Sequence, residues 1–283
     1  IRQPEAINSR HINLNSMIYG WSLMASWPFR ASEYWLREVA KKLVVKERDL
    51  TMLADYWVVG LGSGHRTLHK FLDEPRDVTG DAYTIKSFTG LYKGVRISTI
   101  AIGGGPCYAE WIVALAHARR TRALIGLGFW GALSEELDIG DIVIPLAAAR
   151  DEDLTDHYVD KRIPAIADYE LIKLLEGRLK ELGIVPRMGI VVTTSATFTE
   201  SAKWAREWNR LGGIAVDCET SVVYILTRLC NIPSATVLVV SDSVTEGYGC
   251  SDDERLFRRV TMSYETALRA SLDTIVKLRD KNA

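Results

Sequence analysis

Apolar and polar positions alternate along most of the chain in a way that predicts strands followed by helices. Short apolar runs bounded by glycine or charged residues are typical of buried strands, and apolar positions three or four residues apart are typical of helices that cover a sheet. This order predicts an α/β domain. The predicted strands are 56–59, 96–102, 123–127, 141–147, 188–193 and 235–240, and the predicted helices are 110–118, 169–182, about 252–280 and one that begins near Glu219.

The first 50 residues do not follow this alternation. We predict a helical extension at 1–50, ahead of an α/β domain at 51–283. Apolar positions at 32–43 fall on one stripe, which predicts an amphipathic helix. The apolar stretch at 17–29 is too short to cross a bilayer and contains a proline. We therefore expect the extension to pack as part of the protein.

Composition and charge narrow the class of protein. Hydrophobic residues make up 47% and charged residues 25% of the 283 residues, which is typical of a globular chain. The formal net charge is -1, so no overall field attracts nucleic acid or an anionic membrane. The cysteines show neither CxxC pairing nor metal-ligand spacing, which favours free thiols in a reducing, cytoplasmic compartment. We expect no nucleic-acid partner, no membrane and no bound metal.

Three carboxylates stand in otherwise apolar stretches. Asp217 and Glu219 precede the helix that is predicted to begin there, and Asp242 closes the apolar run at 235–240. Open α/β sheets bind small ligands beyond the carboxyl ends of their strands. An unpaired carboxylate is costly among apolar neighbours, so these positions are candidates for a ligand site.

A glycine-rich loop follows the first predicted strand. Residues 60–66 read Gly-Leu-Gly-Ser-Gly-His-Arg, and we predict that they connect this strand to a helix. Free N–H groups at a helix start, together with the charge of Arg66, suit an oxyanion. A tight turn with a surface arginine is the alternative.

Two further motifs are weaker. Residues 126–131 match GxGxxG, but a new strand is predicted soon afterwards where a dinucleotide site needs a long helix. His65 and His69 have the spacing of two zinc ligands, but no glutamate lies between them and no third ligand is evident. Polar positions on one helix face explain this pair better than a metal site.

These motifs, in this order, resemble those of the nucleoside phosphorylase family, which includes purine nucleoside and uridine phosphorylases and nucleosidases. The resemblance runs from about residue 43 to the C-terminus. It implies a single α/β domain with a central, mixed, twisted β-sheet flanked by helices. The matching segments are Gly-Ser-Gly-His-Arg at 62–66, Thr-Gly-Leu-Tyr-Lys-Gly at 89–94, Gly-Gly-Gly-Pro at 103–106, Gly-Phe-Trp-Gly-Ala at 128–132, Gly-Asp-Ile-Val-Ile at 140–144, Val-Asp-Cys-Glu-Thr at 216–220 and Val-Ser-Asp at 240–242.

The resemblance implies roles for several residues. Glu219 is expected to accept hydrogen bonds from the ribose hydroxyls, with Cys218 packed beneath the sugar and Phe198 stacked near the sugar or base. Asp242 is expected to be the general acid at purine N7, and Arg255 to pair with it when the site closes. The ribose- and base-binding set is Phe198, Asp217, Cys218 and Glu219, and the phosphate-binding set is Gly62, His65 and Arg66.

Departures from the family pattern concern phosphate. Gly126, Phe129 and Tyr83 stand where the family usually has an arginine, a serine and a second arginine, the last of which is supplied to a neighbouring subunit. The charged hydrogen bonds that these arginines give to phosphate are therefore missing. Because each contributes about 1.5–3 kcal/mol to binding, we predict weak phosphate affinity. The water-activating glutamate of the nucleosidases is also absent, because His65 and Arg66 occupy that loop.

The sequence therefore favours phosphorolysis of a purine nucleoside to free base and ribose 1-phosphate, with inorganic phosphate as co-substrate and no cofactor. Ala202 and Trp204 replace the Gln-x-Arg that recognises uracil, which disfavours a uridine phosphorylase. A hydrolytic nucleosidase, a uridine phosphorylase and a non-catalytic nucleoside-binding protein are the alternatives. The resemblance also implies a homo-oligomer, a dimer or a hexamer.

Overall fold

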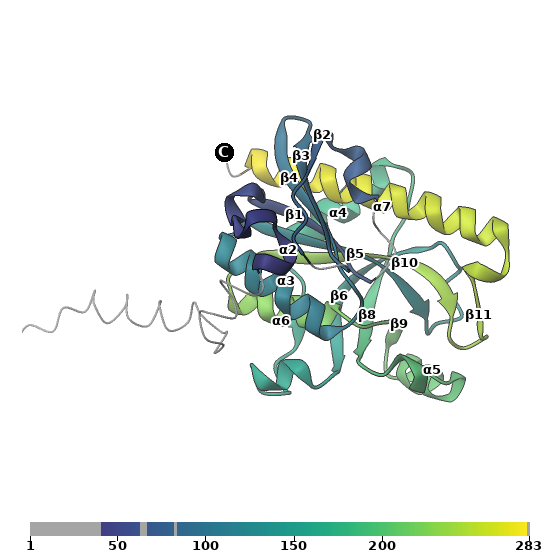
Figure 1. Cartoon of the computed structure of the whole chain (residues 1–283). Coiled ribbons are helices and arrows are strands. Elements are labelled where there is room, and N and C mark those ends of the chain that lie inside the picture. Colours follow the sequence, from purple (N-terminus) through teal and green to yellow (C-terminus); the bar gives the residue numbers. More distant parts are fainter. Residues whose placement is uncertain (1–40, 63–66, 82–83, 282–283) are drawn as a thin grey trace, which may run out of the picture.

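The computed structural model describes residues 41–62, 67–81 and 84–281, and strands alternate with helices along most of this length (Figure 1). Its strands belong to one mixed sheet. They are β1 Tyr56–Gly60, β2 Asp73–Asp77, β3 Lys86–Tyr92, β4 Val95–Ala101, β5 Ala123–Ala132, β6 Ile142–Asp151, β7 Ala165–Ile166, β8 Arg187–Thr194, β9 Gly213–Asp217, β10 Ser234–Ser243 and β11 Tyr248–Gly249.

Five strands close on themselves. β5 pairs with β10 and β9, β10 also pairs with β6, and β8 joins β6 to β9, so the pairings form a ring. β1, β4, β3 and β2 extend the sheet from β5. Parallel pairs such as β1–β5 and antiparallel pairs such as β3–β4 occur together, which makes the sheet mixed.

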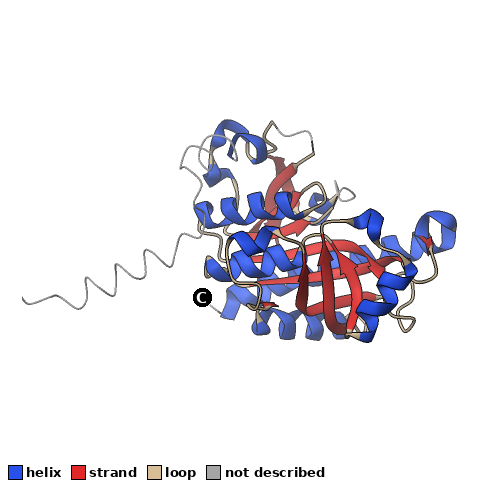
Figure 2. Cartoon of the chain, turned by 90° about the horizontal axis from the view of Figure 1, so that it is seen from below, coloured by secondary structure: helices blue, strands red, loops and turns tan. Residues whose placement is uncertain are grey.

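Helices cover both faces of the sheet (Figure 2). α3 packs against α6 on one face, and α4 packs against α7 on the other. The helix bounds are α2 Lys41–Val44, α3 Pro106–Arg119, α4 Tyr169–Glu181, α5 Ala202–Arg210, α6 Thr220–Leu229 and α7 Glu254–Lys281. Short 3-10 helices are η2 Lys46–Arg48, η3 Leu50–Met52, η4 Leu68–Phe71, η5 Leu154–His157, η6 Thr197–Thr199 and η7 Cys250–Asp252.

A cluster around Asp273 fastens α7 to its neighbours. The carboxylate accepts hydrogen bonds from Lys93 Nζ at 2.5 Å, from Arg178 Nε at 2.7 Å and from the Tyr92 hydroxyl at 3.1 Å. Lys93 belongs to the β3–β4 turn and Arg178 to α4, so one buried acid joins three parts of the chain.

The predicted strands and the α/β class are confirmed. Two local predictions were wrong. The strand predicted at 123–127 runs on to Ala132, through the GxGxxG motif, so no dinucleotide loop forms there. The helix predicted after the loop at 60–66 is only the one-turn η4, because Asp73 already begins β2.

Most of the predicted extension at 1–50 lies outside the described residues. Its last part, from residue 41, joins the domain, since Val44 and Val45 are buried in the main core. The amide of Lys46 donates to the carbonyl of Val78 at 2.8 Å. Among the described residues, no helix has both the length and the apolar character needed to cross a membrane.

Candidate active site

The carboxyl ends of several strands surround a cavity of about 370 Å³. β1 leads into it through Gly62, β9 ends there in Asp217, and β10 brings Asp242 to the same wall. Segments far apart in the sequence therefore meet at one place, as expected for a ligand site of an α/β sheet. The lining residues are Leu61, Gly62, Gly104, Phe129, Trp130, Gly131, Thr197, Glu200, Val216, Asp217, Cys218, Glu219, Ser241 and Asp242.

Both carboxylate oxygens of Asp217 accept hydrogen bonds from groups within the protein. One carboxylate oxygen accepts from the Thr193 hydroxyl, and the other accepts from the amides of Glu219, at 2.7 Å, and Thr220. Burial and the nearby charge of Glu219 raise the pKa of Asp217 well above its usual range, although these hydrogen bonds oppose the shift. Asp217 thus holds the start of α6, and with it the backbone of Glu219.

Glu219 is buried and lies at the N-terminus of α6. Its Oε1 accepts a hydrogen bond of 2.5 Å from the amide of Gly105, which precedes α3 with a φ of 112°. Burial raises the pKa of Glu219 to about 7, against the opposing hydrogen bonds from the amides of Gly105 and Cys218. A carboxylate held in this way can accept hydrogen bonds from ligand hydroxyls that enter the cavity.

Asp242 lies at the end of β10 and is partly buried. The hydroxyl of Ser241 donates to its Oδ1 at 2.6 Å. A methyl group on Gly131 would lie 3.1 Å from Oδ2, and one on Gly249 would lie 3.2 Å from its Cβ. Two strands without side chains at these positions therefore leave room for the carboxyl group, which faces the cavity.

Glu200 is a cavity residue that the sequence analysis missed. It follows η6 and precedes α5, and its amide donates to the carbonyl of Thr197 at 3.2 Å. Burial, and then the charge of Asp242, raise the pKa of Glu200 to about 7. No apolar pattern surrounds Glu200 in the sequence, so the only available signal was an acid near the end of a predicted strand.

Other predicted residues are placed differently. Cys218 lines the cavity, with its Sγ 3.5 Å from the Thr197 hydroxyl. Phe198 and Arg255 do not line it: Phe198 is fully exposed, and the Arg255 side chain is 92% exposed with its Nε 3.7 Å from Asp253. Their stacking and pairing roles require a rearrangement on ligand binding and stay predictions.

The predicted phosphate loop is described only in part. Gly62 lines the cavity with a φ of 78°, and its Cα lies 3.8 Å from the position of a methyl group on Gly104. His65 and Arg66 lie outside the described residues. His69 stacks on Phe88 with ring centroids 3.9 Å apart. Within residues 41–62, 67–81 and 84–281, no group of three or more acidic, histidine or cysteine side chains is arranged to hold a metal.

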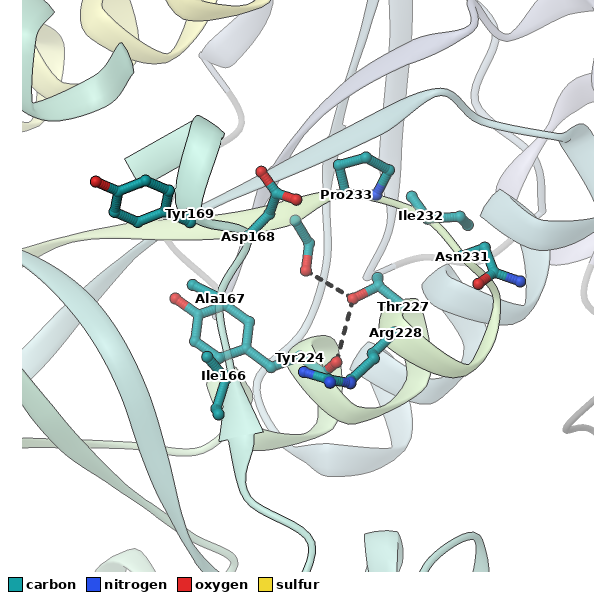
Figure 3. Close-up of a pocket in the computed structure, with 11 residues that line it drawn as sticks. Ile166, Ala167, Asp168, Tyr169, Tyr224, Thr227, Arg228, Asn231, Ile232 and Pro233 are labelled. Carbon is teal, nitrogen blue, oxygen red and sulfur yellow. Dashed lines mark hydrogen bonds between the residues drawn. The ribbon is translucent and has the colours of Figure 1, made fainter. Parts of the chain in front are cut away.

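A second cavity, also of about 370 Å³, lies at the other end of α6 (Figure 3). Tyr169, Asp168 and Arg228 are among the residues that line it. The Thr227 hydroxyl lies 2.6 Å from the Ser234 hydroxyl and donates to the Tyr224 carbonyl at 3.4 Å. None of the predicted site residues lines this cavity, so the cavity at the strand ends around Asp217, Glu219 and Asp242 is the candidate active site.

Comparison with known proteins identifies the family of the chain. Residues 58–277 match the family model described as the phosphorylase superfamily. The chain belongs to this superfamily. The purine nucleoside phosphorylase DeoD-type of Thermoanaerobacter sp. (strain X514) is 30% identical over 170 residues, which span 59% of this chain and 73% of the relative. The protein of the same name from Caldanaerobacter subterraneus subsp. tengcongensis is 31% identical over the same shares of the two chains.

Solved structures show the same fold. Uridine phosphorylase from Vibrio fischeri ES114 superposes with a TM-score of 0.75 at 21% identity, covering 81% of this chain and 95% of that one. Purine nucleoside phosphorylase from Toxoplasma gondii, in complex with immucillin-H, gives a TM-score of 0.74 at 18% identity, covering 85% and 98%. The predicted family and its single α/β domain with a mixed sheet are therefore confirmed.

Proposed function

We propose that the protein cleaves the N-glycosidic bond of purine nucleosides by phosphorolysis, giving the free base and ribose 1-phosphate. The observation that carries this proposal is that Glu219 and Asp242 line one cavity. The first suits ribose hydroxyls and the second suits a leaving base. Relatives at about 30% identity that are named purine nucleoside phosphorylases support the same activity.

The proposed reaction assigns one task to each group. A phosphate oxygen forms a bond to C1′ of the ribose while the bond from C1′ to N9 of the purine breaks. The electron pair of that bond passes into the purine, and Asp242 supplies a proton or hydrogen bond to N7, which makes the base a better leaving group. Glu219 holds the ribose hydroxyls and faces the positive charge that develops on the sugar. Asp217 keeps Glu219 in position through the backbone of α6.

The structure gives a reason for one departure in the phosphate site. A methyl group on Gly126 would lie 2.7 Å from Thr236 Cγ2 and 2.9 Å from Leu61 Cδ1, so no arginine fits at this position of β5. Phe129 stands in place of a serine and packs against Tyr264, with ring centroids 4.9 Å apart. Phosphate therefore depends on the loop that begins at Gly62, and we propose that its affinity is low.

The alternatives differ in a measurable way. A hydrolytic nucleosidase would use water in place of phosphate, and a binding protein would release no base. A uridine phosphorylase would prefer uridine, although Ala202 and Trp204 lie on α5 where the family reads uracil with polar side chains. We also propose that the protein works in the cytoplasm and as a homo-oligomer, a dimer or a hexamer.

Product analysis with and without phosphate tests the proposal. The full chain is incubated with inosine, adenosine and uridine, and chromatography follows base, ribose and ribose 1-phosphate. We expect base release to rise with phosphate concentration and ribose 1-phosphate to accumulate. Release that is unchanged by phosphate and gives free ribose would establish hydrolysis. Calorimetric binding of a nucleoside without any product would establish a binding protein.

A further inference from the structure

Glu200 and Asp242 bring two acidic side chains to the same cavity from separate elements. Asp242 ends β10, whereas Glu200 is fixed between η6 and α5, where Ser201 caps α5 by accepting from the Trp204 amide at 3.2 Å. The part of the chain that the structure describes gives the Glu200 carboxyl no hydrogen bond and no salt bridge. The assignment of Asp242 to the leaving base leaves this second acid without a role.

The surroundings of Glu200 favour a proton shared by the two acids. The titratable neighbours that line the cavity with it are Asp242, Asp217, Cys218 and Glu219, and none of them is basic. The Arg255 side chain points to solvent, so no described cation neutralises the pair. Two acids that share a partly buried site do not both ionise readily, and burial together with Asp242 raises the pKa of Glu200 to about 7.

A purine presents two neighbouring groups to such a pair. In a 6-aminopurine, N7 accepts a hydrogen bond and the amino group donates one, whereas in a 6-oxopurine N7 and O6 both accept. When a purine binds, the lone pair of N7 draws the proton of the pair onto Asp242, the proposed acid. Asp242 then supplies the donor and the ionised Glu200 supplies the acceptor, which matches the 6-aminopurine. A 6-oxopurine needs a donor from both acids.

We propose that Glu200 is a specificity-determining residue, which accepts a hydrogen bond from the 6-amino group while Asp242 donates to N7, so that the site prefers 6-aminopurine nucleosides near neutral pH. This proposal rests on the proposed function. It predicts that protonating Glu200 converts it into a donor for O6. The preference should therefore shift toward 6-oxopurines as the pH falls below about 7 and the pair takes up its second proton.

Competition between adenosine and inosine tests the inference in one preparation, because the ratio of their kcat/KM values is independent of the fraction of folded enzyme. For the wild-type protein, we expect the ratio of adenosine to inosine to fall as the pH is lowered from 8 to 6. Glu200→Gln carries both a donor and an acceptor at every pH. We expect it to lower kcat/KM for adenosine about 10-fold, because a neutral acceptor replaces a charged one, and to remove the pH dependence of the ratio.

Glu207→Gln is the matched control, since Glu207 lies on α5 with a largely exposed side chain near Lys203. It should leave the ratio and its pH dependence unchanged. If Glu200→Gln lowers both substrates equally, or if the wild-type ratio does not depend on pH, Glu200 does not read the base. If the wild-type protein releases the base from neither nucleoside, the proposed function is wrong. This outcome differs from a failure of the Glu200 assignment, in which the base is still released.

Discussion

The carboxyl group of Asp242 lies in a space that glycines make. Gly131 of β5 and Gly249 of β11 flank it, and a methyl group at either position would lie within about 3.2 Å of the Asp242 side chain. The Ser241 hydroxyl is the hydrogen-bond donor that the structure records for it. This packing fixes the carboxyl group toward the cavity, which is what a general acid requires.

Replacing Asp242 with asparagine tests this role. Asp242→Asn keeps the shape of the side chain but cannot deliver a proton, so we expect kcat/KM for a natural purine nucleoside to fall about 10²–10⁴-fold. A purine nucleoside whose base already carries a positive charge at N7 needs no acid and should lose far less. Steady-state kinetics on both substrates checks this. Equal losses on the two would remove Asp242 from the role of acid.

Glu219 is predicted to recognise the sugar by accepting hydrogen bonds from the ribose hydroxyls. Glu219→Gln should reduce kcat/KM for ribosides more than for 2′-deoxyribosides, because the latter already lack one of the two hydroxyl donors. The interaction at stake is a hydrogen bond to a charged acceptor, which contributes about 1.5–3 kcal/mol. If Glu219→Gln and the wild-type protein show the same ratio of kcat/KM between ribosides and 2′-deoxyribosides, the assignment is wrong.

The same variant has a predicted effect on stability. Burial raises the pKa of Glu219 from 4.5 to about 7, so between these pH values the folded protein holds a proton that the unfolded chain has released. The free energy of unfolding should therefore decrease as the pH rises through this window, by about 3 kcal/mol for this group. Urea denaturation of Glu219→Gln should show a smaller decrease. An equal slope in both proteins would mean that Glu219 does not carry the effect.

The sequence predicted the acids that sit in apolar surroundings and missed the one that does not. Asp217, Glu219 and Asp242 interrupt buried strands and a buried helix, so the cost of burying them was visible in the pattern. Glu200 lies in a polar loop, where an acid is ordinary. Its meeting with Asp242 depends on how the segment between η6 and α5 folds over the cavity, and no local pattern encodes that.

At the scale of elements, the positions of strands and helices were predictable but some of their ends were not. β5 runs through the glycines at 126, 128 and 131, which local propensity would place in a loop. Tertiary packing keeps these glycines in the strand, because side chains of Leu61, Thr236 and Val244 occupy the space that a methyl group at these positions would need. The loop after β1 shows the opposite error, since a short η4 replaces the predicted helix.

The Asp273 cluster gives a prediction at this scale. Burial raises the pKa of Asp273, but the hydrogen bonds from Lys93 and Arg178 outweigh it, so the pKa lies below 3.8. Asp273→Asn leaves both cations without their partner and should lower the free energy of unfolding by about 1–3 kcal/mol at neutral pH. Glu254→Gln, which changes an exposed pair with Arg258 on the same helix, should change it by less than about 0.5 kcal/mol.

The pH dependence of this effect has a definite sign. A lowered pKa contributes stability above the unfolded value, and that contribution is lost as the pH falls through the folded value. The difference between wild type and Asp273→Asn should therefore shrink below about pH 4. Denaturant melts from pH 7 to pH 3 measure it. A difference that stays constant over this range would show that shape, and not charge, holds α7 in place.

At the scale of the whole molecule, closing five strands into a ring explains why one cavity collects residues from so much of the chain. β9 reaches β5 only because β8, β6 and β10 complete the circuit, and this places Asp217 and Asp242 near each other. The sequence indicated the strands and their order along the chain. The closure depends on pairings between distant segments, which hydrophobic patterns do not specify.

The outer side of the sheet supports the prediction of an oligomer. Ile166 of β7 and Ile190 of β8 are 42% and 43% exposed, and both pair with Ala147 of β6, so they form an apolar row across three strands. Burying such a row in an interface between subunits removes it from water.

We expect sedimentation equilibrium to show a dimer or a larger assembly. Ile166→Lys with Ile190→Lys should shift it toward monomer, since buried lysines without partners are costly. Leu211→Lys, at an exposed site after α5, is the control and should not change the mass. A wild-type monomer would overturn the prediction, and an unchanged oligomer in the double variant would place the interface elsewhere.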